Sequence, residues 1–92
     1  MPLTVDQKLD LLLTLPWHQV SEVTPEGDRL LRVREVPSAT GSGETVEQLE
    51  ADLRESLRES LRAYLHFGDP LPLPAGCVLP WTENGKTATV TP

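Results

Sequence analysis

The stretch GETVEQL, residues 43–49, opens the longest element that the sequence predicts. Thr45 carries the hydroxyl of a helix N-cap, and Gln48 follows three residues later, which is the spacing of a capping box. Gly43 permits a sharp corner between a strand and this helix. Apolar periodicity continues to about Phe67, and Gly68 then stands where helices commonly end. We therefore expect one long helix from the Thr45 cap to about Phe67.

The apolar side chains of this helix recur every three or four residues and form one stripe. Its members are Val46, Leu49, Leu53, Leu57, Leu61 and Tyr64 or Leu65. Ser56 and Ser60 flank the stripe. The sequence Leu-Arg-Glu-Ser occurs twice in succession, at residues 53–56 and 57–60, which indicates the duplication of one helical turn.

Three arginines run along one side of the stripe: Arg54, Arg58 and Arg62. Such a row can bind nucleic acid, but each arginine also has an acidic residue one turn before it. The acids are Glu50, Glu55 and Glu59. Pairs at this spacing stabilise a helix, so the sequence favours a solvated, salt-bridged face.

The residues before the long helix predict a shorter helix and a small sheet. Residues 4–15 are expected to form a helix, because Thr4 and Gln7 repeat the capping-box spacing and Pro16 ends the pattern. Residues 17–23 and 29–36 are expected to form a hairpin around the turn 24–28, and residues 38–42 a short third strand. Leu30 and Leu31 are adjacent, which leaves open which face of the hairpin is buried.

The residues after the long helix predict extended structure. Prolines at positions 70, 72 and 74 favour polyproline II over residues 69–76. Residues 77–81 and 86–91 are expected strands around the turn at Asn84-Gly85. The predicted fold class is α+β, with a small antiparallel sheet against one long helix. We expect a single domain over residues 1–92, with an N-terminal helix in 1–16, a core in 17–74 and an extended tail in 75–92.

Composition restricts the class of function. The chain of 92 residues carries fourteen acids and eight bases, a net charge of −6. Nucleic-acid binders are usually basic, so this balance argues against one and suits either a basic protein partner or solubility alone. Cys77 is the single cysteine, which excludes an intramolecular disulfide and favours a reducing cytoplasm. The sequence contains neither an apolar run that could span a bilayer nor a secretory leader pattern.

The side chains with possible chemistry do not form a convincing catalytic or metal-binding pattern. His18 and His66 are far apart in the sequence, and Cys77 stands in an apolar run typical of a buried thiol. The acids Glu44, Glu47, Glu50 and Asp52 gather at the start of the long helix, where its dipole stabilises them without a metal. Trp17 and Trp81 are more typical of a core than of binding anchors. We therefore predict neither an enzyme nor a cofactor.

Four motifs resemble the N-terminal domain of HicB-family antitoxins. They are Glu35-Val36-Pro37, the helix entry Gly43-x-Thr45-x-Glu47-Gln48, the leucine-rich run from Leu53 to Leu65, and the exit Gly68-Asp69-Pro70-Leu71-Pro72. The resemblance spans residues 17–74. The chain departs from the family at Ser38, where a glycine is usual. The eighteen residues after Pro74 also hold no helix pattern for the family's C-terminal DNA-binding domain.

The resemblance implies a partial ribonuclease-H-like fold, in which a three-stranded sheet packs on a helix and the domain forms dimers or larger oligomers. It also implies a function, which is to bind and neutralise a small basic toxin ribonuclease of the HicA type. Which residues would bind that partner is unknown from the sequence, and direct DNA binding is not expected. The alternative is a self-associating structural or adaptor module without a toxin partner. A small hydrolase is a third class, and no residue pattern supports it.

Overall fold

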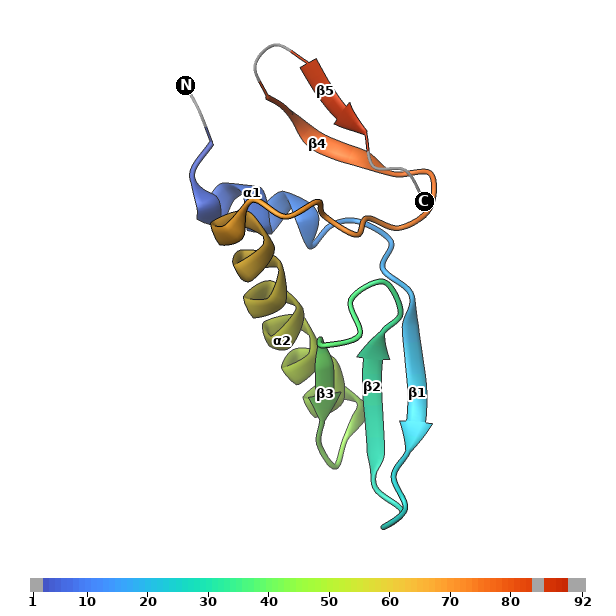
Figure 1. Ribbon diagram of the computed structural model, residues 1–92. Coiled ribbons are helices and arrows are strands. Elements are labelled where there is room, and N and C mark those ends of the chain that lie inside the picture. The colour runs from blue at the N-terminus through green and yellow to red at the C-terminus, as the bar shows by residue number, and fades with distance from the viewer. Residues whose placement is uncertain (1–2, 84–85, 90–92) are drawn as a thin grey trace.

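The computed structural model describes residues 3–83 and 86–89, which form an α+β fold (Figure 1). The elements are α1 (Val5–Leu12), β1 (Gln19–Val23), β2 (Arg29–Val33), β3 (Thr40–Ser42), α2 (Val46–Phe67), β4 (Val78–Glu83) and β5 (Lys86–Thr89). Strands β1 to β3 form one antiparallel sheet in the order β1-β2-β3, and β4 pairs with β5 in a separate hairpin. The predicted fold class is confirmed at this level.

The sheet has one face toward α2, and its register identifies the residues on that face. Leu31 is opposite Ser21 in β1 and Gly41 in β3, and Val33 is opposite Gln19. Directly opposed residues in a sheet point to the same face. Val33 is buried and Leu31 packs against the core. The buried face of the hairpin, which the sequence did not identify, is therefore the face that carries Leu31 and Val33.

The boundaries of α2 are those that the sequence predicts. The Thr45 hydroxyl accepts the Gln48 amide at 3.1 Å, and the Gln48 side chain accepts the Thr45 amide at 3.2 Å. Gly68 ends the helix with φ of 69°, in the left-handed region that suits glycine. These bonds satisfy backbone groups that a helix end leaves without intrahelical partners.

The apolar stripe of α2 is buried along most of its length. Leu49, Leu53, Leu57 and Leu61 are all buried, and Tyr64 and Leu65 are both partly buried against the same core. The prediction was wrong for Val46, which is 54% exposed. This residue lies in the first turn of α2, where the described part of the chain covers less than half of its surface.

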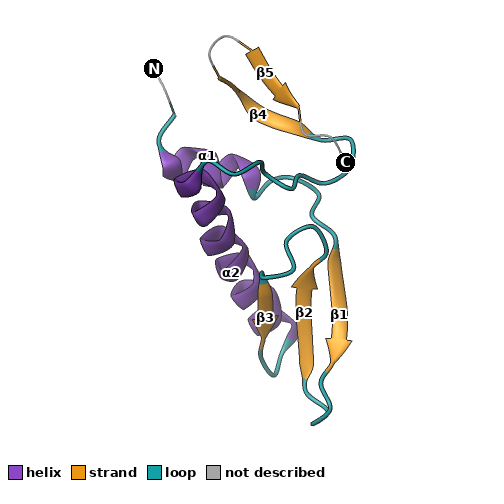
Figure 2. Cartoon of the chain, in the orientation of Figure 1, coloured by secondary structure: helices purple, strands orange, loops and turns teal. Residues whose placement is uncertain are grey.

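Strand β3 lies against α2 through backbone and serine contacts (Figure 2). The Ser56 hydroxyl accepts the Thr40 amide at 3.0 Å, and the Ser38 and Ser60 hydroxyls are 3.2 Å apart. A Cβ at Gly41 would lie 2.8 Å from the Leu53 Cα and closer still to two other backbone atoms of α2. Glycine at this position is therefore what permits the close approach of the strand.

Four elements are shorter than the sequence predicts, and one of them is β3, which begins at Thr40 rather than residue 38. Helix α1 ends at Leu12, because the amides of Thr14 and Leu15 bond to carbonyls three residues back in a tighter turn before Pro16. Strand β1 begins at Gln19 rather than residue 17. Strand β2 ends at Val33 rather than residue 36, because the amide of Val36 turns back to the Val33 carbonyl.

The C-terminal segment packs on the core. Leu71, Leu73 and Pro74 are buried in the extended stretch after α2, and Leu79 and Trp81 of β4 are buried near α1. The predicted pairing of two strands in this segment is confirmed by β4 and β5. The predicted Asn84-Gly85 turn lies outside the described residues. Neither described helix combines the length and the apolar character needed to cross a bilayer.

Candidate functional site

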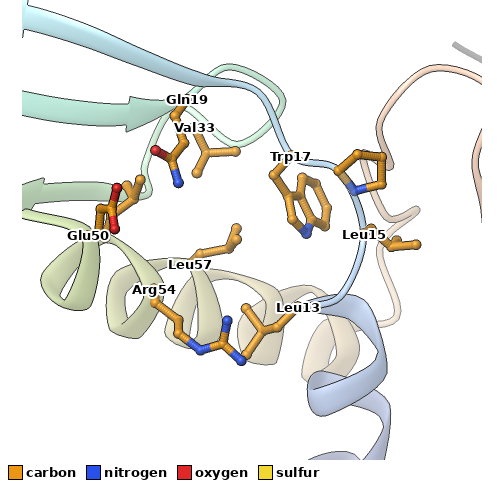
Figure 3. Close-up of a pocket in the computed structure, with 10 residues that line it drawn as sticks. Leu13, Leu15, Trp17, Gln19, Val33, Glu50, Arg54 and Leu57 are labelled. Carbon is orange, nitrogen blue, oxygen red and sulfur yellow. The ribbon is translucent and has the colours of Figure 1, made fainter. Parts of the chain in front are cut away.

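A pocket of about 160 Å³ lies between the sheet and α2, beside the link from α1 to β1 (Figure 3). It is lined by Leu13, Leu15, Pro16, Trp17, Gln19, Val33, Glu50, Leu53, Arg54 and Leu57. This volume is comparable to an engineered cavity of about 150 Å³ that binds benzene. The pocket can therefore accept one large apolar group.

The floor of the pocket is apolar and firmly held. Val33, Leu53 and Leu57 are core residues that each contribute a buried side chain. Trp17 forms a wall, and its indole nitrogen donates a hydrogen bond to the Leu12 carbonyl at 2.8 Å. This bond satisfies the polar edge of the ring, so Trp17 offers the pocket its apolar surface.

The rim of the pocket is polar, with Gln19 on β1 and both Glu50 and Arg54 on α2. The predicted Glu50–Arg54 ion pair was wrong, since no ion pair of either side chain is found within residues 3–83 and 86–89. Figure 3 shows the reason, because the Arg54 side chain extends along α2 toward Leu13 and away from Glu50. Two opposite charges thus remain available at the edge of an apolar hollow.

The other two arginines of the row connect the helices. Arg58 donates to Asp10 at 2.9 Å and to Asp6 at 3.3 Å, both on α1. The hydrogen bond that Arg58 donates to Asp10 is the main cause that raises the pKa of Arg58 above its ordinary range. Arg62 also reaches Asp6 at 3.3 Å. The prediction of a paired row was correct for these two residues.

The partners of these arginines differ from the predicted ones. Arg58 pairs with α1 instead of Glu55, because α1 packs beside this part of α2 and its acids approach the guanidinium. The predicted pair of Arg62 with Glu59 is present, but at 3.9 Å it is longer than the pair with Asp6. The row therefore acts mainly as a bridge between helices.

His18 and Glu35 form the closest titratable pair of the described chain. The Glu35 carboxylate accepts the His18 backbone amide at 3.0 Å and is also bonded to His18 Nδ1. Burial of the carboxyl raises the pKa of Glu35, but these hydrogen bonds lower it more, and the net pKa is below 4.5. The pair joins the start of β1 to the turn after β2, which is a structural role.

The remaining predicted candidates lie in separate places. Cys77 is partly buried against the core, as the sequence suggests, and Trp81 is buried. His66 contacts the ring of Phe67 edge-on, with 4.8 Å between the ring centres. Asp52 accepts the Ser42 amide at 2.9 Å. In the described ranges, no three His, Cys, Asp or Glu side chains gather in a way that could hold a metal ion.

The outward face of α2 carries a row of acids, which we call the acidic row and define as Asp52, Glu55 and Glu59. All three are exposed, and their spacing of three and four residues keeps them on one side of the helix. Glu44 and Glu47 add two exposed acids near its N-terminus. In the part of the chain that the structure describes, Glu55 makes no ion pair.

A second hollow lies on the other side of α2, near its C-terminus. It has a volume of about 350 Å³ and is lined by Ser38, Ser60, Ala63, Tyr64, Phe67 and Asp69. Phe67 is 72% exposed, the largest exposed fraction among the described apolar side chains that stand out on the surface. This hollow is larger than the Trp17 pocket.

Comparisons with protein-family models, curated proteins and solved structures gave no significant match to this chain. The geometry must therefore carry the functional argument. Sequence reasoning missed the Trp17 pocket altogether, because its lining comes from the link after α1, two strands and α2. No local pattern brings such residues together. The helix-entry residues Gly43, Thr45, Glu47 and Gln48 lie together at the start of α2, where they form the cap.

Proposed function

We propose that this protein is a non-enzymatic binding module whose partner is a small basic protein, with a HicB-like role of neutralising a toxin ribonuclease of the HicA type. The observation that carries the proposal is the acidic row on the outward face of α2. The row extends over two turns of α2 and is separate from the stripe of buried leucines. A cytoplasmic location suits a ribonuclease partner and a reduced Cys77.

Charge supports a basic partner. The chain has a net charge of −6. Some of its described basic side chains form internal ion pairs, such as Arg58 with Asp10 and Arg32 with Glu22. The acids of the row are exposed, although Asp52 also accepts the Ser42 amide of β3. Exposed carboxylates attract a positively charged surface over a distance set by the salt concentration. The RNA-binding face of a ribonuclease is such a surface, and covering it would stop access of the substrate.

The candidate catalytic residues support a role without chemistry. His18 is engaged by Glu35 through both its side chain and its amide. Cys77 packs against the core, and His66 lies against Phe67. These contacts give His18, Cys77 and His66 a structural explanation each within the described part of the chain. A second candidate, a self-associating module, is favoured by the exposed apolar side chains of Val23, Val46 and Phe67.

The test begins with the reading frame next to the gene of this chain, which the proposal predicts to encode a small basic protein. The two purified proteins should bind in calorimetry, and the chain should inhibit RNA cleavage by that partner. Binding should weaken steeply with added salt. The proposal would be contradicted if the two proteins did not bind, or if the partner cleaved RNA equally fast with and without this chain.

A matched pair of variants locates the interface. Glu55→Lys changes the centre of the acidic row, and Glu26→Lys makes the same change in the exposed turn between β1 and β2. We expect Glu55→Lys to weaken binding roughly tenfold, since a like charge replaces a favourable one. Glu26→Lys should have a much smaller effect. Equal effects of both variants would show that only net charge matters and that the acidic row is not the interface.

A further inference from the structure

The rim of the Trp17 pocket carries polar side chains that have no partner among the residues described. Gln19, Glu50 and Arg54 all line the pocket. Within residues 3–83 and 86–89, none of these side chains makes a hydrogen bond or an ion pair with another residue. A few polar groups around an apolar hollow are the usual form of a site for a small molecule.

The two charges of the rim lie at different ends of the pocket. Figure 3 shows Glu50 on the side of Gln19, and the Arg54 guanidinium on the side of Leu13. Leu57 lies between them in the same view. A ligand that pairs with both charges must therefore carry a positive group at one end and a negative group at the other.

The surface between the charges is apolar. Val33 and Leu57 are buried core residues that contribute to the floor. The indole nitrogen of Trp17 is bonded to the Leu12 carbonyl, so the ring offers its apolar surface. The pocket volume of about 160 Å³ suits one six-membered ring, by comparison with an engineered cavity of about 150 Å³ that binds benzene.

We propose that the Trp17 pocket binds a small zwitterion of the ω-amino acid class, in which a compact apolar body separates an ammonium group from a carboxylate. The apolar body lies on Val33 and Leu57, against Trp17. The ammonium group donates a hydrogen bond to Glu50. Arg54 donates two parallel hydrogen bonds to the carboxylate, which is the geometry that a guanidinium favours.

The pair of opposite charges decides between classes of ligand. A neutral apolar molecule would displace water from Glu50 and Arg54 without replacing its hydrogen bonds, which costs free energy. A ligand with one charge would satisfy one of the two groups and leave the other unpaired. An α-amino acid carries both charges on one carbon atom, so it does not reach both ends of the pocket. Only charges at opposite ends of the ligand match the rim.

The proposed ligand site is separate from the proposed protein interface. Asp52, Glu55 and Glu59, which form the acidic row, do not line the pocket. The ligand therefore requires no basic protein partner, and a test with a small molecule is independent of the test of the antitoxin role.

Isothermal titration calorimetry of the full chain tests the proposal, with para-(aminomethyl)benzoate as the probe. This compound carries an ammonium group and a carboxylate on opposite sides of one ring. Benzylamine and para-toluate carry the same ring with one charge each, and L-phenylalanine carries both charges at one end. We expect the probe to bind at least about tenfold more tightly than each of the three comparison compounds.

Neutral variants of nearly the same size assign each charge. Glu50→Gln should weaken binding of the probe about tenfold and should not weaken binding of para-toluate. Arg54→Gln should weaken binding of the probe and of para-toluate, but not of benzylamine. The matched controls are Glu55→Gln and Arg34→Gln, which remove the same charges at exposed positions that do not line the pocket. Both controls should bind the probe as the wild type does.

Nuclear magnetic resonance of the indole N–H groups locates the bound probe. The Trp17 signal should shift during the titration. The Trp81 signal is the internal control and should stay in place, because Trp81 is buried and does not line the pocket. The proposal would be overturned if the probe did not bind, if it bound no more tightly than the comparison compounds, or if only the Trp81 signal shifted. Equal effects of Glu50→Gln on the probe and on para-toluate would also overturn it.

Discussion

Replacement of Gly41 by alanine tests whether β3 lies as close to α2 as the structure indicates. A Cβ at this position would be 2.8 Å from the Leu53 Cα and nearer still to the Leu49 carbonyl oxygen and the Leu53 amide nitrogen. Ordinary contacts of a Cβ begin at 3.4 Å. All three obstacles are backbone atoms in the middle of a helix, so no rotation of a side chain can relieve them. The strand must move away by more than half an ångström.

The cost of this movement follows from what it disturbs. Insertion of a methyl group into a packed region typically costs about 1–3 kcal/mol. Here the shift also loosens the hydrogen bonds from the β3 amides to Ser56 and Asp52, each worth about 1 kcal/mol. We therefore expect Gly41→Ala to lower the free energy of unfolding by about 2–4 kcal/mol, a large part of the stability of a small domain.

Urea denaturation followed by circular dichroism measures this change. The matched control is Ser42→Ala, on the same strand, where the side chain is exposed and the backbone donor to Asp52 is kept. It should change the free energy by no more than about 0.5 kcal/mol. Because the obstacle is backbone, adding Leu49→Ala to Gly41→Ala should not restore stability. A Gly41→Ala chain as stable as the wild type would refute the close packing of β3 on α2.

Three further predictions follow from the caps, the core and the charges. Thr45→Ala should lower the free energy of unfolding by about 1 kcal/mol through loss of the cap. Leu57→Ala should lower it by about 2–5 kcal/mol, because it leaves a cavity in the stripe. The reverse order in urea denaturation would show that Leu57 is not buried as described. Because the pKa of Glu35 is lowered in the folded state, its contribution to stability is present at pH above the ordinary pKa of a glutamate and is lost as the pH falls through the lowered pKa. Denaturation midpoints between about pH 3 and pH 6 should thus fall less steeply for Glu35→Gln than for the wild type, and parallel curves would contradict the role of the His18 pair. The purified chain should not bind duplex DNA specifically at physiological salt, because it is acidic and Arg58 is engaged by Asp10; a sequence-dependent mobility shift with its own upstream region would contradict this expectation.

The predicted site shows where sequence reasoning stops. The helix-entry motif was located correctly, because a capping box joins residues only three positions apart. The arginine row was recognised as paired, and the Arg62–Glu59 pair is present, but the predicted partner of Arg58 was wrong, since Asp6 and Asp10 come from another helix. The spacing of Glu50 and Arg54 predicts a pair that the structure lacks, because the Arg54 side chain lies along α2 toward Leu13. Helical spacing shows which pairs are possible, and the packing around them decides which ones form.

The sequence by itself determined the elements of this protein: the ends of α2, the hairpin of β1 and β2, and the leucines that form the core. These features depend on hydrogen bonds and periodicity among near neighbours in the chain, which can be read in one dimension. Only the tertiary structure decided that Gly41 touches the backbone of α2 and that Trp17 closes a pocket beside Arg54. Such contacts join residues from several elements, and their positions follow from how all apolar faces pack together rather than from any one segment.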